Sequence, residues 1–511
     1  MTVPARAIWL LVLFFVLSAA AAIAARMSTP AFAILGALLL LLLGYVSYRA
    51  PRLMLVVAAT TPLVDRYIYA LLVPPRFATV TSFFSESLLL VVGLVILFRG
   101  LQTRSLGTAL RHPATPLAIL FGVVAVISAL VNNVPPVIAA GGLLFTVDAI
   151  VLFFLPRIVG FDAGQGRVAI SILVIVAVIA GVLALGQVIL APNILGLATS
   201  FGRFGEGQRV GAFLEGSPNM LGALLATALP FPLFAISQTT ARRPRLALTA
   251  VVFVLSLALL YTFSRGAWVG LAAAGLAMGL LLDRRAVLIL ITMAALVYGL
   301  GHVMPRNLLL SPEEQQLTNP AEGGFEFDLG QATFGRVDAI SEGSDLRVLF
   351  ITNATPIIAD HPLVGAGPGR YGGAIAARFG SPLYDEYRAG SVPLHRTVDN
   401  YWLHLTVEFG VLGLLLMLGL IGAIVFELAT AARRSSGVAR TILAGAAAAA
   451  IVLTVDSLAE MLLEGNTMSF PLWFVLGVGS AIVATQRAGL LPSSQGRPGV
   501  VPRRASTRPV R

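Results

Sequence analysis

Three stretches of this chain combine arginine with glycine or polar residues. The first runs from Arg203 to Asn219, the second is Thr262-Phe-Ser264-Arg265-Gly266, and the third runs from His361 to Tyr371 and on through His395 to Trp402. Arginine stays charged at physiological pH and offers a planar fork of N–H donors that matches phosphate oxygens. A histidine or an aspartate in such a place can act as a general base. Together these residue types can hold a phosphate and deprotonate a hydroxyl.

The elements that must position these residues are membrane-spanning helices. Hydrophobic residues make up 57% of the chain and charged residues only 12%, which is too apolar for a soluble globular protein. Apolar runs of about 18 residues or more recur, each long enough to cross ~30 Å of hydrocarbon. We expect an all-α polytopic membrane protein with about 12–14 transmembrane helices. Fourteen apolar segments are predicted, at 8–25, 31–48, 53–73, 83–98, 115–131, 136–156, 168–190, 217–237, 246–263, 266–282, 286–304, 401–429, 441–463 and 469–486.

Charge is distributed unevenly between the connections. Residues 305–400 hold twelve of the 24 acidic residues against seven arginines, whereas alternate short connections elsewhere are rich in arginine. Arginine-rich loops stay in the cytoplasm, so this pattern predicts cytoplasmic termini and one large extracytoplasmic loop. The expected organisation is about eleven helices in 1–304, the loop domain in 305–400, about three helices in 401–486, and a disordered cytoplasmic tail in 487–511.

Inside the loop, residues 345–360 have the pattern of an amphipathic helix lying along the membrane. His361-Pro362 should end it, because a residue before proline is pushed out of helical geometry. A tight glycine turn at Gly365–Gly369 follows, and Asp399 is expected to cap the next spanning helix.

The order of these motifs resembles the O-antigen ligase and O-antigen polymerase family of bacterial membrane glycan-assembly proteins. The resemblance covers residues 200–430 well and the earlier helices only by topology. The matching motifs are Arg209-Val-Gly-Ala-Phe213, Pro218-Asn219, Ser264-Arg265-Gly266, His361-Pro-Leu-Val-Gly365-Ala-Gly367, Asn400-Tyr401 and Glu408-Phe-Gly410-Val-Leu-Gly413.

This resemblance implies a glycosyltransferase that moves a glycan from a polyprenyl-diphosphate donor to an acceptor hydroxyl. The sequence has no carboxylate cluster with metal-ligand spacing, so we expect transfer without a metal or other cofactor, and displacement at the anomeric carbon would invert its configuration. Ligases of the family usually have His-Asn, with the histidine as the proposed catalytic base, where this chain has Asp399-Asn400, with His395 four residues earlier than Asp399. Either His395 or Asp399 is therefore the candidate catalytic base. The candidate diphosphate-binding residues are Arg209, Arg265 and Arg347, and residues expected to bind substrate or support the site are Asn219, His361, Arg370 and Asn400.

The expected partners are a polyprenyl-diphosphate-linked glycan, an acceptor glycan or glycolipid, and the lipid bilayer, with no nucleic acid. The expected location is the bacterial plasma (inner) membrane, with the chemistry on its outer face. Polymerase and ligase both remain open. The alternative is a solute or ion transporter, which would usually carry ionisable residues at mid-membrane. Few acidic residues lie within the predicted spans, namely Asp65, Glu86, Asp148, Asp456 and Glu460, which favours the enzyme.

Overall fold

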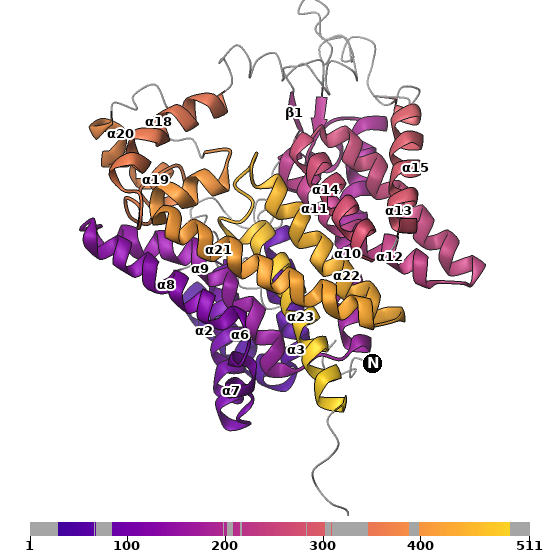
Figure 1. Cartoon of the computed structure of the whole chain (residues 1–511), viewed down its shortest axis with the longest axis horizontal. Helices are drawn as coiled ribbons and strands as arrows, with labels where there is room; N and C mark the ends of the chain where they lie inside the picture. Colours follow the sequence, from indigo (N-terminus) through magenta and orange to yellow (C-terminus); the bar gives the residue numbers. More distant parts are fainter. Residues whose placement is uncertain are drawn as a thin grey trace, which may run out of the picture.

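The protein is a bundle of helices with a smaller helical layer at one end. The computed structural model describes residues 29–65, 67, 84–197, 199–201, 208–214, 217–282, 284–301, 308, 346–387 and 398–490. These residues are almost entirely helical apart from one two-stranded antiparallel sheet. Figure 1 shows the short helices α18 (Leu346–Asp360), α19 (Ala374–Phe379) and α20 (Pro382–Glu386) together at the upper end of the bundle. We call this the loop end.

The long helices occur in three runs along the chain. The first run is α2 (Thr29–Arg49), α3 (Pro51–Thr60), η1 (Thr61–Leu63), α6 (Phe84–Gln102), α7 (Ser105–Leu110), α8 (Ala114–Val131), α9 (Pro136–Val159) and α10 (Ala163–Ile189). After η3 (Ile194–Gly196), β1 (Thr199–Phe201) and β2 (Gln208–Val210) come α11 (Pro218–Ala228), α12 (Pro230–Gln238), α13 (Arg242–Thr262), α14 (Arg265–Leu281) and α15 (Arg284–Gly301). The third run is α21 (Tyr401–Arg434), α22 (Gly437–Asp456) and α23 (Asn466–Leu490).

The predicted all-α membrane fold is confirmed. Among the described residues, nine helices are long and apolar enough to cross a membrane, and three shorter apolar helices accompany them. Twelve of the fourteen predicted segments coincide with these helices in whole or in part, segment 31–48 coincides with α2, and segment 8–25 lies outside the described residues. Two segments differ in detail. Segment 217–237 is divided into α11 and α12 at Pro230, and α22 ends at Asp456 rather than at residue 463.

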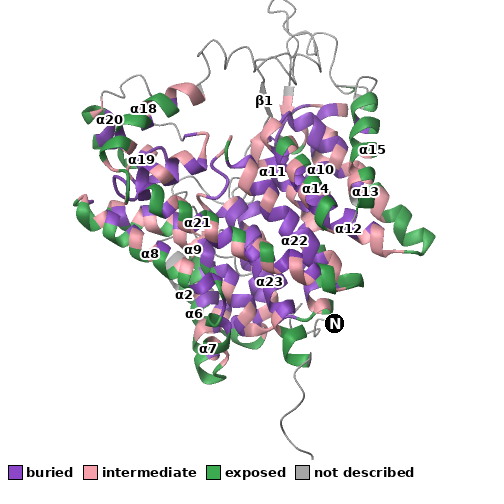
Figure 2. Cartoon of the chain, in the orientation of Figure 1, coloured by how far each residue is buried: buried purple, intermediate pink, exposed green. Residues whose placement is uncertain are grey.

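The last two helices form the centre of the bundle. Figure 2 shows α22 and α23 mostly buried, with exposed residues on the outer helices. Small residues on α22 let its neighbours approach closely, since tight packing brings membrane helices together. The Cα of Gly270 on α14 lies against the backbone of Val452, and Gly445 leaves room for the Phe231 ring. The outer faces carry large apolar side chains such as Phe426, which is 74% exposed.

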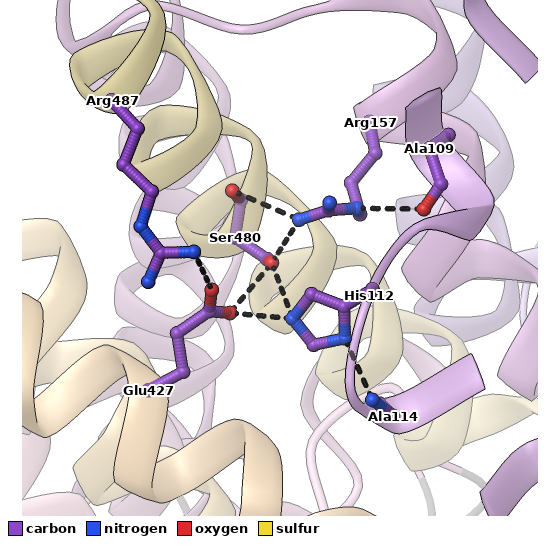
Figure 3. Close-up of polar contacts among 7 residues, drawn as sticks. All are labelled: Ala109, His112, Ala114, Arg157, Glu427, Ser480 and Arg487. Atoms are coloured by element: carbon purple, nitrogen blue, oxygen red, sulfur yellow. Dashed lines mark hydrogen bonds and ion pairs between the residues drawn. The ribbon is translucent and has the colours of Figure 1, made fainter. Parts of the chain in front are cut away.

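A polar cluster ties four elements together at the end of the bundle opposite to the loop end (Figure 3). The carboxylate of Glu427 on α21 accepts from Ser480 Oγ at 2.8 Å and lies 2.7 Å from His112 Nε2. His112 Nδ1 accepts a backbone N–H, which leaves Nε2 to donate to Glu427. Arg157 of α9 donates to Ser480, and the exposed Arg487 lies 3.3 Å from the other carboxylate oxygen.

Replacing Glu427 with alanine should destabilise the protein by about 3–5 kcal/mol, because a buried ion pair would lose one partner. Thermal unfolding in lipid nanodiscs measures this effect. Arg487→Ala is the matched control, since it removes the exposed partner of the same carboxylate and should cost at most about 1 kcal/mol. Equal losses in the two variants would contradict the structural role assigned to the buried contacts.

Candidate active site

Arg209 joins the first two arginine motifs. Its Nε donates to the carbonyl of Thr262 at 2.9 Å, and its Nη2 donates to Asn219 Oδ1 at 2.6 Å. Thr262 is the last residue of α13 and directly precedes the turn that carries Arg265. Strand β2 therefore holds Arg209 against the Ser264-Arg265-Gly266 motif and the start of α11, although these motifs are about fifty residues apart in sequence.

The turn between α13 and α14 is sharp because Phe263 takes a left-handed conformation with φ of 49°. Ser264 N donates to Thr262 Oγ1 at 3.2 Å, and α14 begins at Arg265, which is half-buried. Glycine allows two close approaches here. A Cβ on Gly222 would overlap Ser264, and a Cβ on Gly266 would overlap the carboxylate of Asp456. The tight packing fixes the place from which the Arg265 side chain starts.

Arg347 enters the same region from α18. Its Nη2 donates to the carbonyl of Ala459 at 2.8 Å and lies 3.6 Å from Glu460 Oε1 and 3.9 Å from Asp399 Oδ2. Glu460 also accepts a hydrogen bond from Asn219 Nδ2, so the contacts run without a break from Arg347 to Arg209. We call Arg209, Asn219, Arg347, Asp399 and Glu460 the arginine–carboxylate cluster.

The face of α18 that packs inward sets the position of Arg347. Phe350, Ala354 and Ile357, spaced one turn apart, are buried together with Tyr371 and Val407. The Tyr371 hydroxyl also donates to the Phe350 carbonyl at 2.9 Å. The predicted helix is present and ends before His361-Pro362, but much of its apolar stripe contacts protein instead of a membrane surface.

Burial dominates the electrostatics of Glu460. It raises the pKa of this carboxyl to about 8, and the nearby negative charge of Asp399 adds to the rise, while Arg347 opposes it. Glu460 follows the end of α22, in the connection to α23. A carboxyl group whose pKa lies near neutrality can both give and take a proton at physiological pH.

Glu460 and Asp456 are not among the site residues predicted from the sequence. The sequence places both inside the apolar segment 441–463, but α22 ends at Asp456, so Glu460 lies in the connection beside the arginines. Asp456 is fully buried with its carboxylate against Gly266. The available signal was the spacing of two acids, four residues apart, at the end of an apolar run. Such acids more often lie at a helix end than in the middle of a span.

The glycine turn is a docking element. Gly365, Gly367 and Gly369 have φ of 74°, 110° and 74°, which glycine adopts without strain. The turn lies against α21, where the Glu408 carboxylate accepts from the backbone N–H groups of Gly369 and Tyr371, both at 2.9 Å. These bonds agree with the expected tight turn, and the amide groups that a phosphate cradle would need are occupied by Glu408.

Helix α21 is interrupted where the turn docks. Gly410 has φ of 68°, so the helical hydrogen-bond ladder is broken there. The loop supplies the missing partners, since Val411 N donates to the Pro362 carbonyl at 2.9 Å and Ala366 N donates to the Val407 carbonyl at 2.8 Å. The two glycine motifs recognised in the sequence, at 361–367 and 408–413, therefore bind one another through their backbones.

The remaining predicted residues lie around the cluster or away from it. Asn400, not Asp399 as expected, caps α21 by accepting from Leu403 N at 3.0 Å. His361 is half-buried, and its carbonyl accepts from Gly365 N at 3.1 Å, which places it in the docking turn. Arg370 donates to the Ala366 carbonyl in the same turn. His395 lies outside the described residues.

His404 and Glu408 lie on one face of α21, as their spacing of four predicts. Their side chains are 3.6 Å apart and almost completely buried. His404 Nδ1 also contacts the Tyr371 carbonyl. The pair holds the loop to the helix, which agrees with the structural alternative for these two residues. Among the residues that the structure describes, no group of three or more His, Cys, Asp or Glu side chains is arranged to hold a metal ion.

The match to a known family falls on this part of the chain. Residues 250–418 match the family model described as O-antigen ligase. This match supports the resemblance to the O-antigen ligase and polymerase family that the sequence motifs indicate. The matched O-antigen ligase segment contains Arg265, Arg347, Asp399 and both docking motifs, while Arg209 and Glu460 lie outside it and are joined to it by the contacts above. No curated protein sequence is significantly similar to the chain.

Substituting alanine for Gly365 should destabilise the docked loop strongly. The new Cβ would overlap the backbone of Glu408 and Phe409, in addition to about 1–2 kcal/mol of left-handed strain. Gly437→Ala is the matched control, because Gly437 has a φ of 57° but open space around its Cα. Thermal unfolding of both variants separates the overlap from the strain. Equal losses would show that the close approach has no energetic weight.

Glu460 should make stability depend on pH. Its raised pKa means that the folded protein holds the proton more tightly than the unfolded chain. The stabilisation is fully present below pH ~4.5 and is lost as the pH rises to about 8. In denaturation titrations across this range, Glu460→Gln should flatten the fall, whereas the exposed control Glu386→Gln should keep it. An unchanged slope in Glu460→Gln would contradict the assigned pKa.

Proposed function

We propose that the protein is a membrane glycosyltransferase that moves a glycan from a polyprenyl-diphosphate donor to an acceptor hydroxyl. The observation that carries this proposal is the O-antigen ligase match over a segment whose Thr262 carbonyl, next to the Ser264-Arg265-Gly266 turn, is bound by Arg209. The family supports glycan assembly in a membrane, and the converging arginines supply the chemistry that a diphosphate requires. The proposed site is thus formed where the helices meet the loop end.

The proposed task of Arg209, Arg265 and Arg347 is to bind the diphosphate. Arg209 donates to the Thr262 carbonyl and to the Asn219 amide oxygen, and these two bonds orient its guanidinium. Arg347 faces the two carboxylates Asp399 and Glu460, which orient it toward the same region. As the bond from sugar to diphosphate breaks, negative charge develops on the leaving oxygen, and nearby guanidinium groups stabilise it.

The proposed reaction is a single displacement. The acceptor hydroxyl gives its proton to a base, its oxygen bonds to the anomeric carbon, and the polyprenyl diphosphate leaves with the bonding electrons. Attack opposite to the leaving group inverts the anomeric configuration, and the arginines supply the positive charge without a metal. Asp399, with a side chain that is 43% exposed, is open to solvent on the cluster, and His395 is the alternative base.

We further propose that the site faces the outside of the bacterial plasma (inner) membrane. Arginines gather at the start of α13 (Arg242, Arg243 and Arg245) and on both sides of the junction between α21 and α22 (Arg433, Arg434 and Arg440), and arginine-rich connections stay in the cytoplasm. This orientation leaves both termini in the cytoplasm and the loop 305–400 outside. A lipid-linked glycan in the outer leaflet would then present its diphosphate at the depth of the arginine–carboxylate cluster.

Arg209→Ala, Arg265→Ala and His395→Ala should each abolish glycan transfer, with losses of at least ~10²-fold, while the protein still inserts and folds. The assay uses purified protein in nanodiscs with a lipid-linked oligosaccharide. Arg242→Ala is the control, because Arg242 is an exposed arginine at the far end of α13. Longer lipid-linked products would indicate a polymerase, and label on a different acceptor a ligase. Normal transfer by Arg265→Ala would refute the diphosphate role.

A further inference from the structure

An apolar groove of about 300 Å³ lies between α13, α14 and α15. This volume is at the lower end of the ~300–1,000 Å³ range of small-molecule sites. Its walls are almost entirely hydrocarbon and aromatic rings, and no charged side chain contributes to them. The lining residues are Ser256, Leu259, Leu260, Trp268, Leu271, Ala272, Leu290, Ala294, Val297 and Tyr298.

The groove opens sideways from the bundle. Its inner wall is formed by buried residues, including Leu259 and Val297, which are 4% and 3% exposed. Its rim is formed by the exposed residues Ala272, Ala294 and Tyr298 on the outer faces of α14 and α15. In Figure 1 these helices lie at the edge of the bundle, and their surfaces are apolar. In a membrane the mouth of the groove therefore faces lipid.

One end of the groove lies beside the arginine turn. Leu259 and Leu260 belong to the last turn of α13, directly before Thr262, whose carbonyl accepts from Arg209. Trp268 lies one turn after Arg265 on α14, and its indole N–H donates to the Leu259 carbonyl at 3.3 Å across the two helices. The apolar walls thus begin within one helical turn of the residues proposed to hold the diphosphate.

We propose that this groove holds the isoprene units of the lipid carrier that lie next to its diphosphate. This inference rests on the proposed function, and it adds a place for the hydrocarbon part of the donor. In a polyprenyl diphosphate the chain starts directly at the phosphate oxygen, so a protein that binds the diphosphate at Arg209 and Arg265 must receive hydrocarbon immediately beside it. The groove offers a matching apolar surface there, and its lateral mouth lets the remaining chain continue into the bilayer.

The test uses a polyprenyl diphosphate that bears a photoreactive diazirine on the isoprene nearest the diphosphate, with the whole protein in nanodiscs. Crosslinks should fall on residues of α13, α14 and α15 that line the groove, and unlabelled polyprenyl diphosphate should compete with them. Ala294→Trp, which fills the rim, should reduce this labelling by at least about tenfold. Leu280→Trp is the matched control, because Leu280 is 73% exposed on α14 and does not line the groove.

Three outcomes would overturn the assignment. The first is labelling confined to other helices, and the second is full labelling of the Ala294→Trp variant. The third is equally strong labelling of the groove by a phospholipid with a diazirine on its acyl chain, if polyprenyl diphosphate does not displace that phospholipid. Glycan transfer measured on the same protein separates this inference from the function. Wild-type transfer without groove labelling would refute the groove alone, whereas competed labelling in a protein that transfers no glycan would refute the glycosyltransferase and retain the lipid site.

Discussion

Buried charge in this apolar protein must be compensated by other parts of the same chain, and the site is organised around that constraint. Glu460, whose side chain is 15% exposed, follows the end of α22, and its carboxyl group accepts from Asn219 and lies near Arg347. Asn219 in turn accepts from Arg209, which also binds the α13 carboxyl end. One carboxylate thereby brings residues separated by hundreds of positions into a single cluster. The cluster stabilises the fold only if each of its polar groups has a hydrogen-bond or ion-pair partner, because an unpaired charge inside the protein costs several kcal/mol of stability.

The membrane-spanning helices could be predicted from the sequence, because the length and hydropathy of a segment determine whether it forms such a helix. Almost every apolar segment from 31–48 onward proved to be helical, since a bilayer leaves an apolar chain few other ways to satisfy its backbone. The family was also predictable, because its motifs include glycines whose positions are dictated by backbone geometry. Gly365 and Gly410 need conformations that only glycine adopts easily, so their spacing persists as a readable pattern.

The partners inside the site were less predictable. Hydropathy places Glu460 within a span because it locates helix ends only to within several residues, whereas the end of α22 at Asp456 shows that Glu460 lies in a connection. Asn400 instead of Asp399 caps the N-terminus of α21, and hydropathy cannot detect a difference of one residue in the position of a helix cap. The contact of Arg209 with the α13 terminus depends on the packing of β2, which no local pattern in the sequence encodes.

Where α21 is interrupted, backbone hydrogen bonds align the loop with the helix residue by residue. The carbonyls of Pro362 and Leu363 accept from Val411 and Leu412, while Val407 and Glu408 accept from the loop in return. One inserted residue between Pro362 and Gly367 would misalign these reciprocal bonds and leave main-chain groups without partners. The number of residues in this short segment is consequently constrained as strictly as their identity. Length variation in this part of the loop should be tolerated poorly during evolution, even where substitutions are neutral.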